Sequence, residues 1–330
     1  MAIDVHCHYI PDAYWRYIQD EERFGVRLAW GEGESGHLEV GSKRYTISQE
    51  FFDLGLQIAR MDRLGIDVAV ISLATPLINY SVPESEAVKA AEIFNDELAR
   101  VRREGRGRFE GWAFLPMQNP EAAARELRRS VQQLGLRGGH IASNVAGRYL
   151  SDPAYAPIYE AAVALNVPLF VHPSNPPGQD RLRDYELEVV AGYLFDSTVN
   201  IFHAIFGGLL DRYPGLKLCV AHLGGYALHL RGRMQREVDT NPTLAARIHR
   251  PVGDYLKRLY YDTICFEEGY LDYAANVVGA DRLVLGSDAP FLLGEPDPVA
   301  FVRKAFGDGH TRKQVLQENA ATLLKLSQPS

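Results

Sequence analysis

The chain of 330 residues is 46% hydrophobic and 23% charged, with a formal net charge of −7 at pH 7. This composition is typical of a soluble globular protein with a large core, the negative charge argues against nucleic-acid or anionic-membrane partners, and we find no apolar run of about 18 residues that suggests a membrane span. The three cysteines, Cys7, Cys219 and Cys265, are far apart and nothing before Asp4 resembles a signal peptide, so we expect a reducing, cytoplasmic location.

The first predicted element is a short buried strand, Ile3–His6, with His8 two residues beyond His6. In a strand, residues two apart point to the same side, so His6 and His8 present two imidazoles together. Two neutral imidazoles on one face make half of a zinc-type site. Taken alone, the pair is equally compatible with two ordinary histidines at the end of a strand.

A helical segment, Ile10–Glu22, comes next, and then a Gly-rich stretch of alternating pattern over residues 24–47 with a turn at Gly41-Ser42. This pattern predicts a small β excursion inserted after the first strand. An insertion of this kind either decorates the surface or, in a barrel enzyme, covers the mouth of the barrel.

From residue 51 onward, helices alternate with short strands that are continuously apolar. With the first strand, the predicted strands are Ile3–His6, Val68–Ser72, Gly111–Phe114, Gly138–Ala142, Pro168–His172, Leu216–His222, Leu259–Thr263 and Arg282–Asp288. The predicted helices are Phe51–Leu64, Ser85–Gly105, Pro120–Leu134, Pro153–Leu165, Glu186–Arg212, Gly225–Val238, Gly269–Val278, Pro298–Phe306 and Arg312–Leu326.

Continuously apolar strands indicate parallel pairing with helices on the outside. Eight such units predict a (β/α)8 TIM barrel, with residues 1–330 forming a single domain that carries the β insertion. The alternative is an open doubly wound sheet, but no Gly-x-Gly-x-x-Gly turn follows an early strand.

Four histidines and an aspartate stand at the ends of predicted strands. They are His6 and His8 on the first strand, His172 on the fifth, His222 on the sixth and Asp288 on the eighth. Because catalytic groups of a barrel lie at the carboxyl ends of its strands, these side chains predict a shared metal site on one rim. Individually, His172 could cap its strand, His222 could be a hydrogen-bonding neighbour of the metal, and Asp288 could cap the next helix.

The other histidines are interpreted as structural or surface residues. They are His37, His140, His203, His229 and His249. His140, at the end of the fourth strand, is the first exception to consider.

Taken together, these motifs resemble the amidohydrolase superfamily, and most closely its branch of aminocarboxymuconate-semialdehyde decarboxylase and related nonoxidative decarboxylases. The resemblance runs from Ile3 to about Asn319. The motifs that carry it are His6-x-His8, His172-Pro173, His222-x-Gly224-Gly225, Gly286-Ser287-Asp288-x-Pro290, the stretch from Met61 to Val68, Arg212-Tyr213-Pro214 and Gly232-Arg233.

The resemblance implies that one divalent metal is bound by His6, His8, His172 and Asp288. Zinc is the expected ion, with Mn²⁺ and Fe²⁺ as alternatives, and His222 would stand beside it as acid/base. Binuclear members of the superfamily carry a bridging carboxylated lysine on strand four. This chain has no lysine near His140, which favours one metal.

The resemblance also implies a homodimer, because Arg233 falls where the decarboxylase has an arginine that reaches the substrate carboxylate of a neighbouring subunit. The decarboxylase's second carboxylate-binding arginine is matched here by Thr46, with Arg44 two residues away. This departure leaves the particular substrate open. Asn175, Arg181 and Phe291 follow strand ends and are further candidates to line the pocket.

Three imidazoles and a carboxylate leave a coordination position for water, whose pKa the cation lowers, with Asp288 and His222 handling its proton. The first hypothesis is nonoxidative decarboxylation of an aromatic or muconate-type carboxylic acid. The second is hydrolysis of an amide, a lactone or a carbon–carbon bond with the same ligands. The third is a noncatalytic metal-binding scaffold, which the His-rich site at a barrel mouth disfavours.

Overall fold

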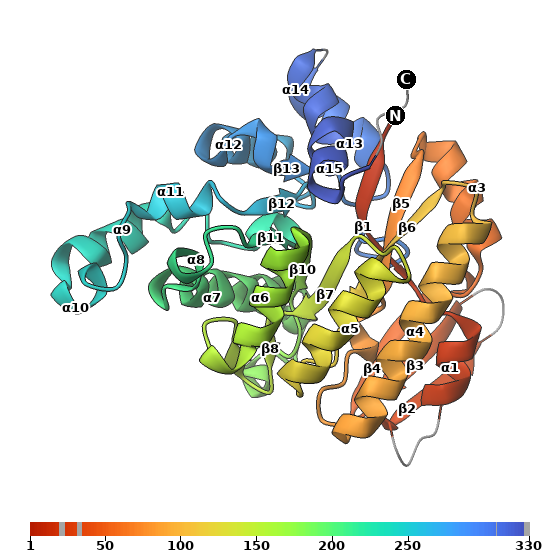
Figure 1. The fold of residues 1–330 in the computed structure, drawn as a ribbon. Coiled ribbons are helices and arrows are strands. Elements are labelled where there is room, and N and C mark those ends of the chain that lie inside the picture. Colours follow the sequence, from red (N-terminus) through yellow and green to blue (C-terminus); the bar gives the residue numbers. More distant parts are fainter. Residues whose placement is uncertain (20–23, 32–34, 308, 327–330) are drawn as a thin grey trace.

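Eight parallel strands form the central sheet of this protein, for which a computed structural model describes residues 1–19, 24–31, 35–307 and 309–326 (Figure 1). Their order in the sheet is their order in the chain. The strands are β1 (Ile3–Tyr9), β5 (Val68–Leu73), β6 (Phe109–Phe114), β7 (Gly138–Ala142), β10 (Pro168–His172), β11 (Lys217–Val220), β12 (Tyr260–Asp262) and β13 (Leu283–Val284).

Backbone hydrogen bonds join the last strand segment to β1 and close the sheet. Val5 N donates to Leu285 O, Asp288 N to His6 O and His8 N to Ala289 O, each with a donor–acceptor distance of 2.8 Å. The predicted TIM barrel is therefore confirmed. The eighth predicted strand is shorter than expected, because β13 has only two residues in regular pairing and the segment after it meets β1 through these separate bonds.

Helices follow the strands around the barrel (Figure 1). They are α1 (Asp12–Ile18), α3 (Leu54–Leu64), α4 (Glu84–Glu104), α5 (Pro120–Gln132), α6 (Ala156–Leu165), α7 (Tyr193–Phe206), α8 (Leu209–Arg212), α9 (Arg231–Thr240), α10 (Pro242–Ala245), α11 (Val252–Leu256), α12 (Glu268–Val278), α13 (Pro298–Phe306), α14 (His310–Lys313) and α15 (Asn319–Leu324). Side-chain caps define where several helices begin. Before α3, for example, the Asp53 side chain accepts hydrogen bonds from Gly55 N and Leu56 N.

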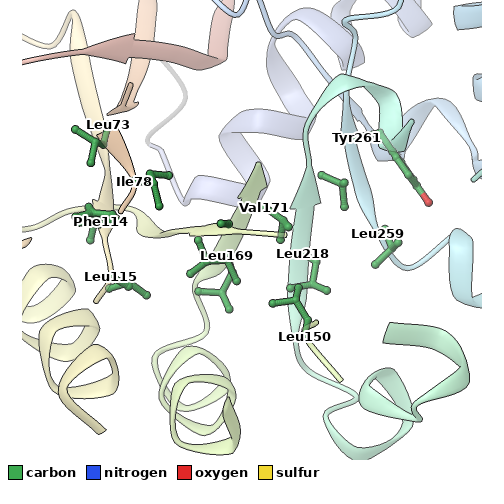
Figure 2. Packing of buried hydrophobic residues seen from close by; sticks show 14 of the residues in the cluster. Leu73, Ile78, Phe114, Leu115, Leu150, Leu169, Val171, Leu218, Leu259 and Tyr261 are labelled. Carbon is green, nitrogen blue, oxygen red and sulfur yellow. The ribbon is translucent and has the colours of Figure 1, made fainter. Parts of the chain in front are cut away.

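The core has two parts. Between the sheet and the helices, apolar side chains such as Leu115, Leu169 and Leu218 pack in a continuous layer, which Figure 2 shows from close by. Inside the barrel, a smaller cluster contains Ile3, at the start of β1, and Leu323 of α15. α15 therefore packs at the amino-terminal end of the strands, opposite the end that carries the predicted metal ligands.

The inserted β excursion is a three-stranded antiparallel sheet after β1. Its strands are β2 (Val26–Trp30), β3 (Ser35–Val40) and β4 (Lys43–Ser48). The turn at Gly41-Ser42 joins β3 to β4, and Gly41 has a φ of +59°, which a glycine adopts at little cost. In Figure 1 this sheet lies beside α1 and α4.

Two predicted helices are interrupted at glycines. The segment predicted as one helix from Gly225 begins as a turn, and α9 starts only at Arg231, because Gly224 and Gly225 have φ of +71° and +64°. The long helix predicted from Glu186 is divided into a π-helical turn at Glu188–Gly192, α7 and α8, the last two separated at Gly208.

Smaller differences concern the ends of elements. The first predicted helix reaches Glu22, but α1 ends at Ile18 and residues 20–23 lie outside the described residues. The closing helix contains a π-helical turn, Gln314–Glu318, between α14 and α15. A short hairpin of β8 (Asn144–Val145) and β9 (Arg148–Tyr149) follows β7 and was not anticipated.

The expectation that no apolar run reaches membrane-spanning length is wrong for one segment. Glu188–Phe206 has 19 residues and a mean hydropathy of 1.3, and 44% of it is buried inside the molecule. Its buried side chains include Asp196 and Asn200, which form hydrogen bonds with the loops after β7. This packing against the barrel accounts for part of the apolar character of the segment.

Candidate metal centre

The five side chains predicted for the metal site converge at the carboxyl-terminal end of the barrel. Asp288 Oδ1 lies 3.1 Å from His6 Nε2, 2.9 Å from His8 Nε2 and 4.0 Å from His172 Nε2. Asp288 Oδ2 lies 3.3 Å from His222 Nε2. Histidines from the ends of the first, fifth and sixth strands of the barrel thus surround one carboxylate, which follows the eighth.

Four of the five side chains make the tightest group. Ligand atoms of His6, His172, His222 and Asp288 all lie within 4.8 Å of one another. His8 flanks this group, with its Nε2 atom 3.2 Å from His6 Nε2. The geometry therefore places His222 as close to the centre as the residues predicted to be ligands.

Hydrogen bonds behind the imidazoles fix which nitrogen faces the centre. His6 Nδ1 donates to Asp262 Oδ2 over 2.6 Å, His8 Nδ1 to the Leu73 carbonyl over 3.1 Å, and His172 Nδ1 to the Pro173 carbonyl over 2.9 Å. With Nδ1 as the donor, each Nε2 turns a lone pair toward Asp288.

Lone pairs on three nitrogens and a carboxylate cannot satisfy one another, so this donor set fits a cation. His172 Nε2 is buried and has no hydrogen-bond partner among the described residues. Unpaired buried acceptors are costly, and neutral imidazoles with one carboxylate are the ligand types that Zn²⁺ and similar ions prefer. We conclude that the residues present fit a divalent metal.

The pKa directions in the centre show which charge the site favours. Burial disfavours a charged His6, but the Asp288 and Asp262 carboxylates outweigh it and raise the pKa of His6 to about 10. Burial would raise the pKa of Asp288, but His6 and the other imidazoles hold it well below its usual value. Burial and the imidazoles of His222 and His6 lower the pKa of His172 well below its usual value. The site stabilises a positive charge next to Asp288.

Asp262, at the end of β12, is a functional residue that sequence reasoning missed. Besides its bond to His6, it accepts hydrogen bonds from His222 N over 2.9 Å and Leu223 N over 3.0 Å. It therefore orients one imidazole and fixes the turn that carries another. Asp262 could have been identified from the sequence, because it ends an apolar strand as Asp288 does.

His140 lies near the centre but outside the tight group. Its ring is fully buried, 6.2 Å from the ring of His172 and 5.5 Å from that of Phe170. Neither ring nitrogen has a hydrogen-bond partner among the described residues. Burial, and then His8 and His6, lower the pKa of His140 well below its usual value, so the ring is neutral.

A cavity of about 520 Å³ lies next to the centre, between the inserted sheet, the loop after β5 and the loop after β10. The metal-site residues themselves do not line it. Its wall reaches a metal-site residue through Thr75, whose Oγ1 lies 3.1 Å from His172 Nδ1, the ring nitrogen that faces away from Asp288. Asn175 lines this cavity as predicted. Phe291 instead packs against His8, with ring centroids 5.0 Å apart.

The predicted contacts of Arg44 and Thr46 with the substrate are not supported by the orientation of β4. Alternate residues of a strand face opposite sides, and here Lys43 and Tyr45 line the cavity while Arg44 and Thr46 are exposed. The polar side chains that the insertion offers to the cavity are thus one residue away from the predicted pair.

Arg233 and Arg181 are both exposed. Arg233 belongs to α9, which extends away from the barrel together with α10 in Figure 1, so within its own subunit it does not reach the metal centre. Arg181 ends a short 3-10 turn after β10 and does not line the cavity.

Comparison with known proteins places this geometry among relatives. The family model described as Amidohydrolase matches residues 3–326. The chain is 32% identical over 333 aligned residues to 2-amino-3-carboxymuconate-6-semialdehyde decarboxylase of Dictyostelium discoideum, which covers 99% of this chain and 92% of that protein.

Two solved structures with bound manganese are also similar. One is a dihydroxybenzoic acid decarboxylase from Polaromonas sp. JS666 with the inhibitor 2-nitroresorcinol, at 25% identity and a TM-score of 0.81, covering 99% of this chain and 98% of that one. The other is 5-carboxyvanillate decarboxylase from Novosphingobium aromaticivorans with 4-hydroxy-3-methoxy-5-nitrobenzoic acid, at 26% identity and a TM-score of 0.81, covering 99% and 96%.

Proposed function

This chain belongs to the amidohydrolase family, and from that premise we propose that it is a metal-dependent nonoxidative decarboxylase of an aromatic or muconate-type carboxylic acid. The observation that carries the proposal is the convergence of His6, His8, His172 and His222 on Asp288. This site lies in a chain that is similar over almost its whole length to named decarboxylases. The substrate class is taken from those relatives.

We propose that His6, His8, His172 and Asp288 hold one divalent ion, with zinc and manganese as the ions to compare. When bound, such an ion supplies a Lewis acid that polarises an oxygen of the substrate. The sequence has no lysine near His140, so the proposal stays with one ion.

The remaining steps belong to the chain's own groups. The cavity orients the acid, with Thr75 at the wall nearest to the centre. The bond between the carboxylate and its carbon breaks, carbon dioxide leaves, and that carbon takes up one proton. His222 is placed to move this proton, because its Nε2 contacts Asp288 Oδ2 while its Nδ1 has no hydrogen-bond partner among the described residues.

We further propose a cytoplasmic homodimer in which Arg233 of one subunit binds the departing carboxylate in the cavity of the other. The exposure of Arg233 on α9 and its distance from its own barrel support this arrangement. Mixing His222→Asn with Arg233→Ala subunits tests it. An intact site is regenerated only if Arg233 acts across the dimer.

The central test is carbon dioxide release from a panel of hydroxybenzoates and muconate semialdehydes by the metal-loaded protein. The His222→Asn variant should lose roughly 10²–10⁴-fold in kcat, as expected for removal of a general acid or base. Its metal content should stay near that of the wild type. Release from no acid in the panel, or full activity in the variant, would contradict the proposal. Oxygen-18 from water in the organic product would instead indicate hydrolysis.

A further inference from the structure

The cavity next to the metal centre has a charged wall on the side of the inserted sheet. Among the described residues that line it, Lys43 is the only cationic side chain. The arginine and threonine beside it on β4 face away from the cavity. An acid in the cavity therefore meets at most one cation from this subunit's own wall.

That cation is already paired. Lys43 Nζ forms an ion pair with Glu188 Oε1, and the two side chains are only 28% and 20% exposed. Glu188 lies in the π-helical turn before α7, so the pair joins the inserted sheet to the segment that follows β10. The positive charge of Lys43 is thus largely neutralised where it borders the cavity.

Two tyrosine hydroxyls extend the same wall. Tyr45 and Tyr193 line the cavity, form a hydrogen bond with each other, and Tyr193 also bonds to Glu188. Burial raises the pKa of Tyr45, and burial followed by Tyr45 and Glu188 raises that of Tyr193, so both hydroxyls stay protonated. The wall offers donors and acceptors but no net positive charge.

We propose that Lys43, Glu188, Tyr45 and Tyr193 select a substrate that carries a neutral polar substituent, such as a hydroxyl, and reject one that carries a second carboxylate. This inference rests on the proposed function, since it assumes that the acid which loses carbon dioxide occupies the cavity. It assigns the substrate class to monocarboxylic hydroxy acids.

The physical reason is the asymmetry between the two groups. A hydroxyl can accept from Lys43 or a tyrosine and donate to a tyrosine oxygen, so it satisfies the wall without disturbing the ion pair. A second carboxylate has no proton to donate, and the one cation that it meets on this wall is already neutralised by Glu188, which pairs with Lys43 but does not itself line the cavity. Selectivity then depends on Glu188, because its ion pair with Lys43 withholds that cation from a second carboxylate.

Two nitro compounds, which have no carboxylate at the reacting position to lose, test the inference by binding alone. 2-Nitroresorcinol carries only hydroxyls beside the nitro group, and 4-hydroxy-3-methoxy-5-nitrobenzoic acid carries a carboxylate as the remote group. Isothermal titration of the manganese-loaded wild type should show tighter binding of the first compound. In Glu188→Gln, affinity for the nitrobenzoate should rise by about tenfold while that for nitroresorcinol changes little.

Two further variants make the result specific. Adding Lys43→Met to Glu188→Gln should abolish the gain, because the unpaired cation that causes it is removed. Glu39→Gln, which removes the same charge from β3 rather than from the partner of Lys43, should leave both affinities unchanged. Thermal unfolding of each variant establishes that it is folded.

Tighter binding of the nitrobenzoate to the wild type, equal responses of the two compounds to Glu188→Gln, or binding of neither compound would overturn the inference. Failure of the proposed function is a separate outcome. If no acid releases carbon dioxide but the two compounds bind with the expected preference, the selectivity of the cavity stands and decarboxylation does not.

Discussion

Asp262 lies behind the metal centre, and its two oxygens bind both an imidazole and the backbone of the next turn. Oδ2 accepts from His6 Nδ1 and His222 N, and Oδ1 accepts from Leu223 N and Ile264 N. The side chain is fully buried. Because two functional residues depend on it, its role is to position them rather than to contact substrate.

Replacing Asp262 with Asn should weaken metal binding by roughly 10–100-fold, because the amide is a poorer acceptor for His6 Nδ1 and turns a donor toward one of the backbone N–H groups. Competition with a fluorescent chelator measures the affinity. Asp281→Asn, an exposed aspartate in a surface ion pair, is the matched control and should retain wild-type affinity. Equal metal affinities in the two variants would show that Asp262 does not contribute to metal binding.

The ligand residues could be predicted from the sequence because each ends an apolar strand, and in a barrel all such ends meet. The orientation of β4 could not be predicted in this way. Alternation predicts that Arg44 and Thr46 share a face, but both faces of this strand carry polar residues, so the pattern does not say which face meets the cavity. Only the packing of the inserted sheet against the barrel decides it.

At the scale of elements, the turn after β11 places His222. His222 and Leu223 have φ of +54° and +52°, and Gly224 and Gly225 continue in the left-handed region. The helical pattern of the sequence beyond Gly225 was misleading, because its apolar side chains pack as a turn before α9 begins. Glycines in this turn permit close packing against α7.

Replacing Gly225 with Ala should destabilise the fold by roughly 2–4 kcal/mol and lower activity, since φ is positive and a Cβ would overlap the Leu194 carbonyl oxygen and lie 2.8 Å from Thr198 Oγ1. Urea unfolding measures the change. Gly232→Ala, in α9 with no atom within 4 Å of the added Cβ, should be neutral or stabilising by up to about 1 kcal/mol. Similar losses in both variants would refute this account of the turn.

α7 is tied to the barrel by a buried carboxylate, Asp196. It accepts hydrogen bonds from Ser143 Oγ, from Asn144 Nδ2 over 3.1 Å and from Tyr149 Oη over 2.9 Å. Burial raises the pKa of Asp196, and these hydrogen bonds only partly offset it. The folded protein therefore favours the protonated carboxyl more than the unfolded chain does.

The contribution of Asp196 to stability should be largest below its ordinary pKa of 3.8 and fall as pH rises through the raised value in the folded state. Asp196→Asn cannot titrate. The free energy of unfolding of the wild type, relative to the variant, should thus decrease as pH rises from about 4 through the raised pKa, by roughly 1.4 kcal/mol for each unit of raised pKa. Urea titrations at intermediate pH values measure it, and a difference that is constant or grows with pH would show the opposite sign.

At the scale of the whole molecule, closure of the barrel brings together groups that are remote in the chain. His8 and Asp288 are 280 positions apart and in hydrogen-bond contact. The eightfold alternation of apolar strands and helices was sufficient to predict this closure, because eight parallel units with outer helices have few other ways to bury both faces of the sheet. The exact length of the last strand depended on contacts with β1.

Because a bound ion would link the ends of three strands of the folded barrel and would find no such site in the unfolded chain, metal should stabilise the entire fold. Removal with a chelator should lower the unfolding temperature, and manganese or zinc at a hundredfold excess over Kd should restore about 2.7 kcal/mol, or roughly 5 °C. Differential scanning calorimetry measures the shift. The Asp288→Asn variant, deprived of the carboxylate, should show a much smaller response. An unchanged midpoint in the wild type would argue against the site.

The inserted sheet is drawn from one short early stretch of the chain, whereas the ligand residues are scattered from one end of the sequence to the other. The residues proposed for the reaction and those proposed for substrate selection therefore lie in different parts of the sequence. Exchange of residues 26–48, along with the partner at position 188, would redirect the enzyme toward other acids and spare the machinery that breaks the bond. Related enzymes could therefore diverge in substrate through changes in the inserted sheet alone, while the reaction stays the same.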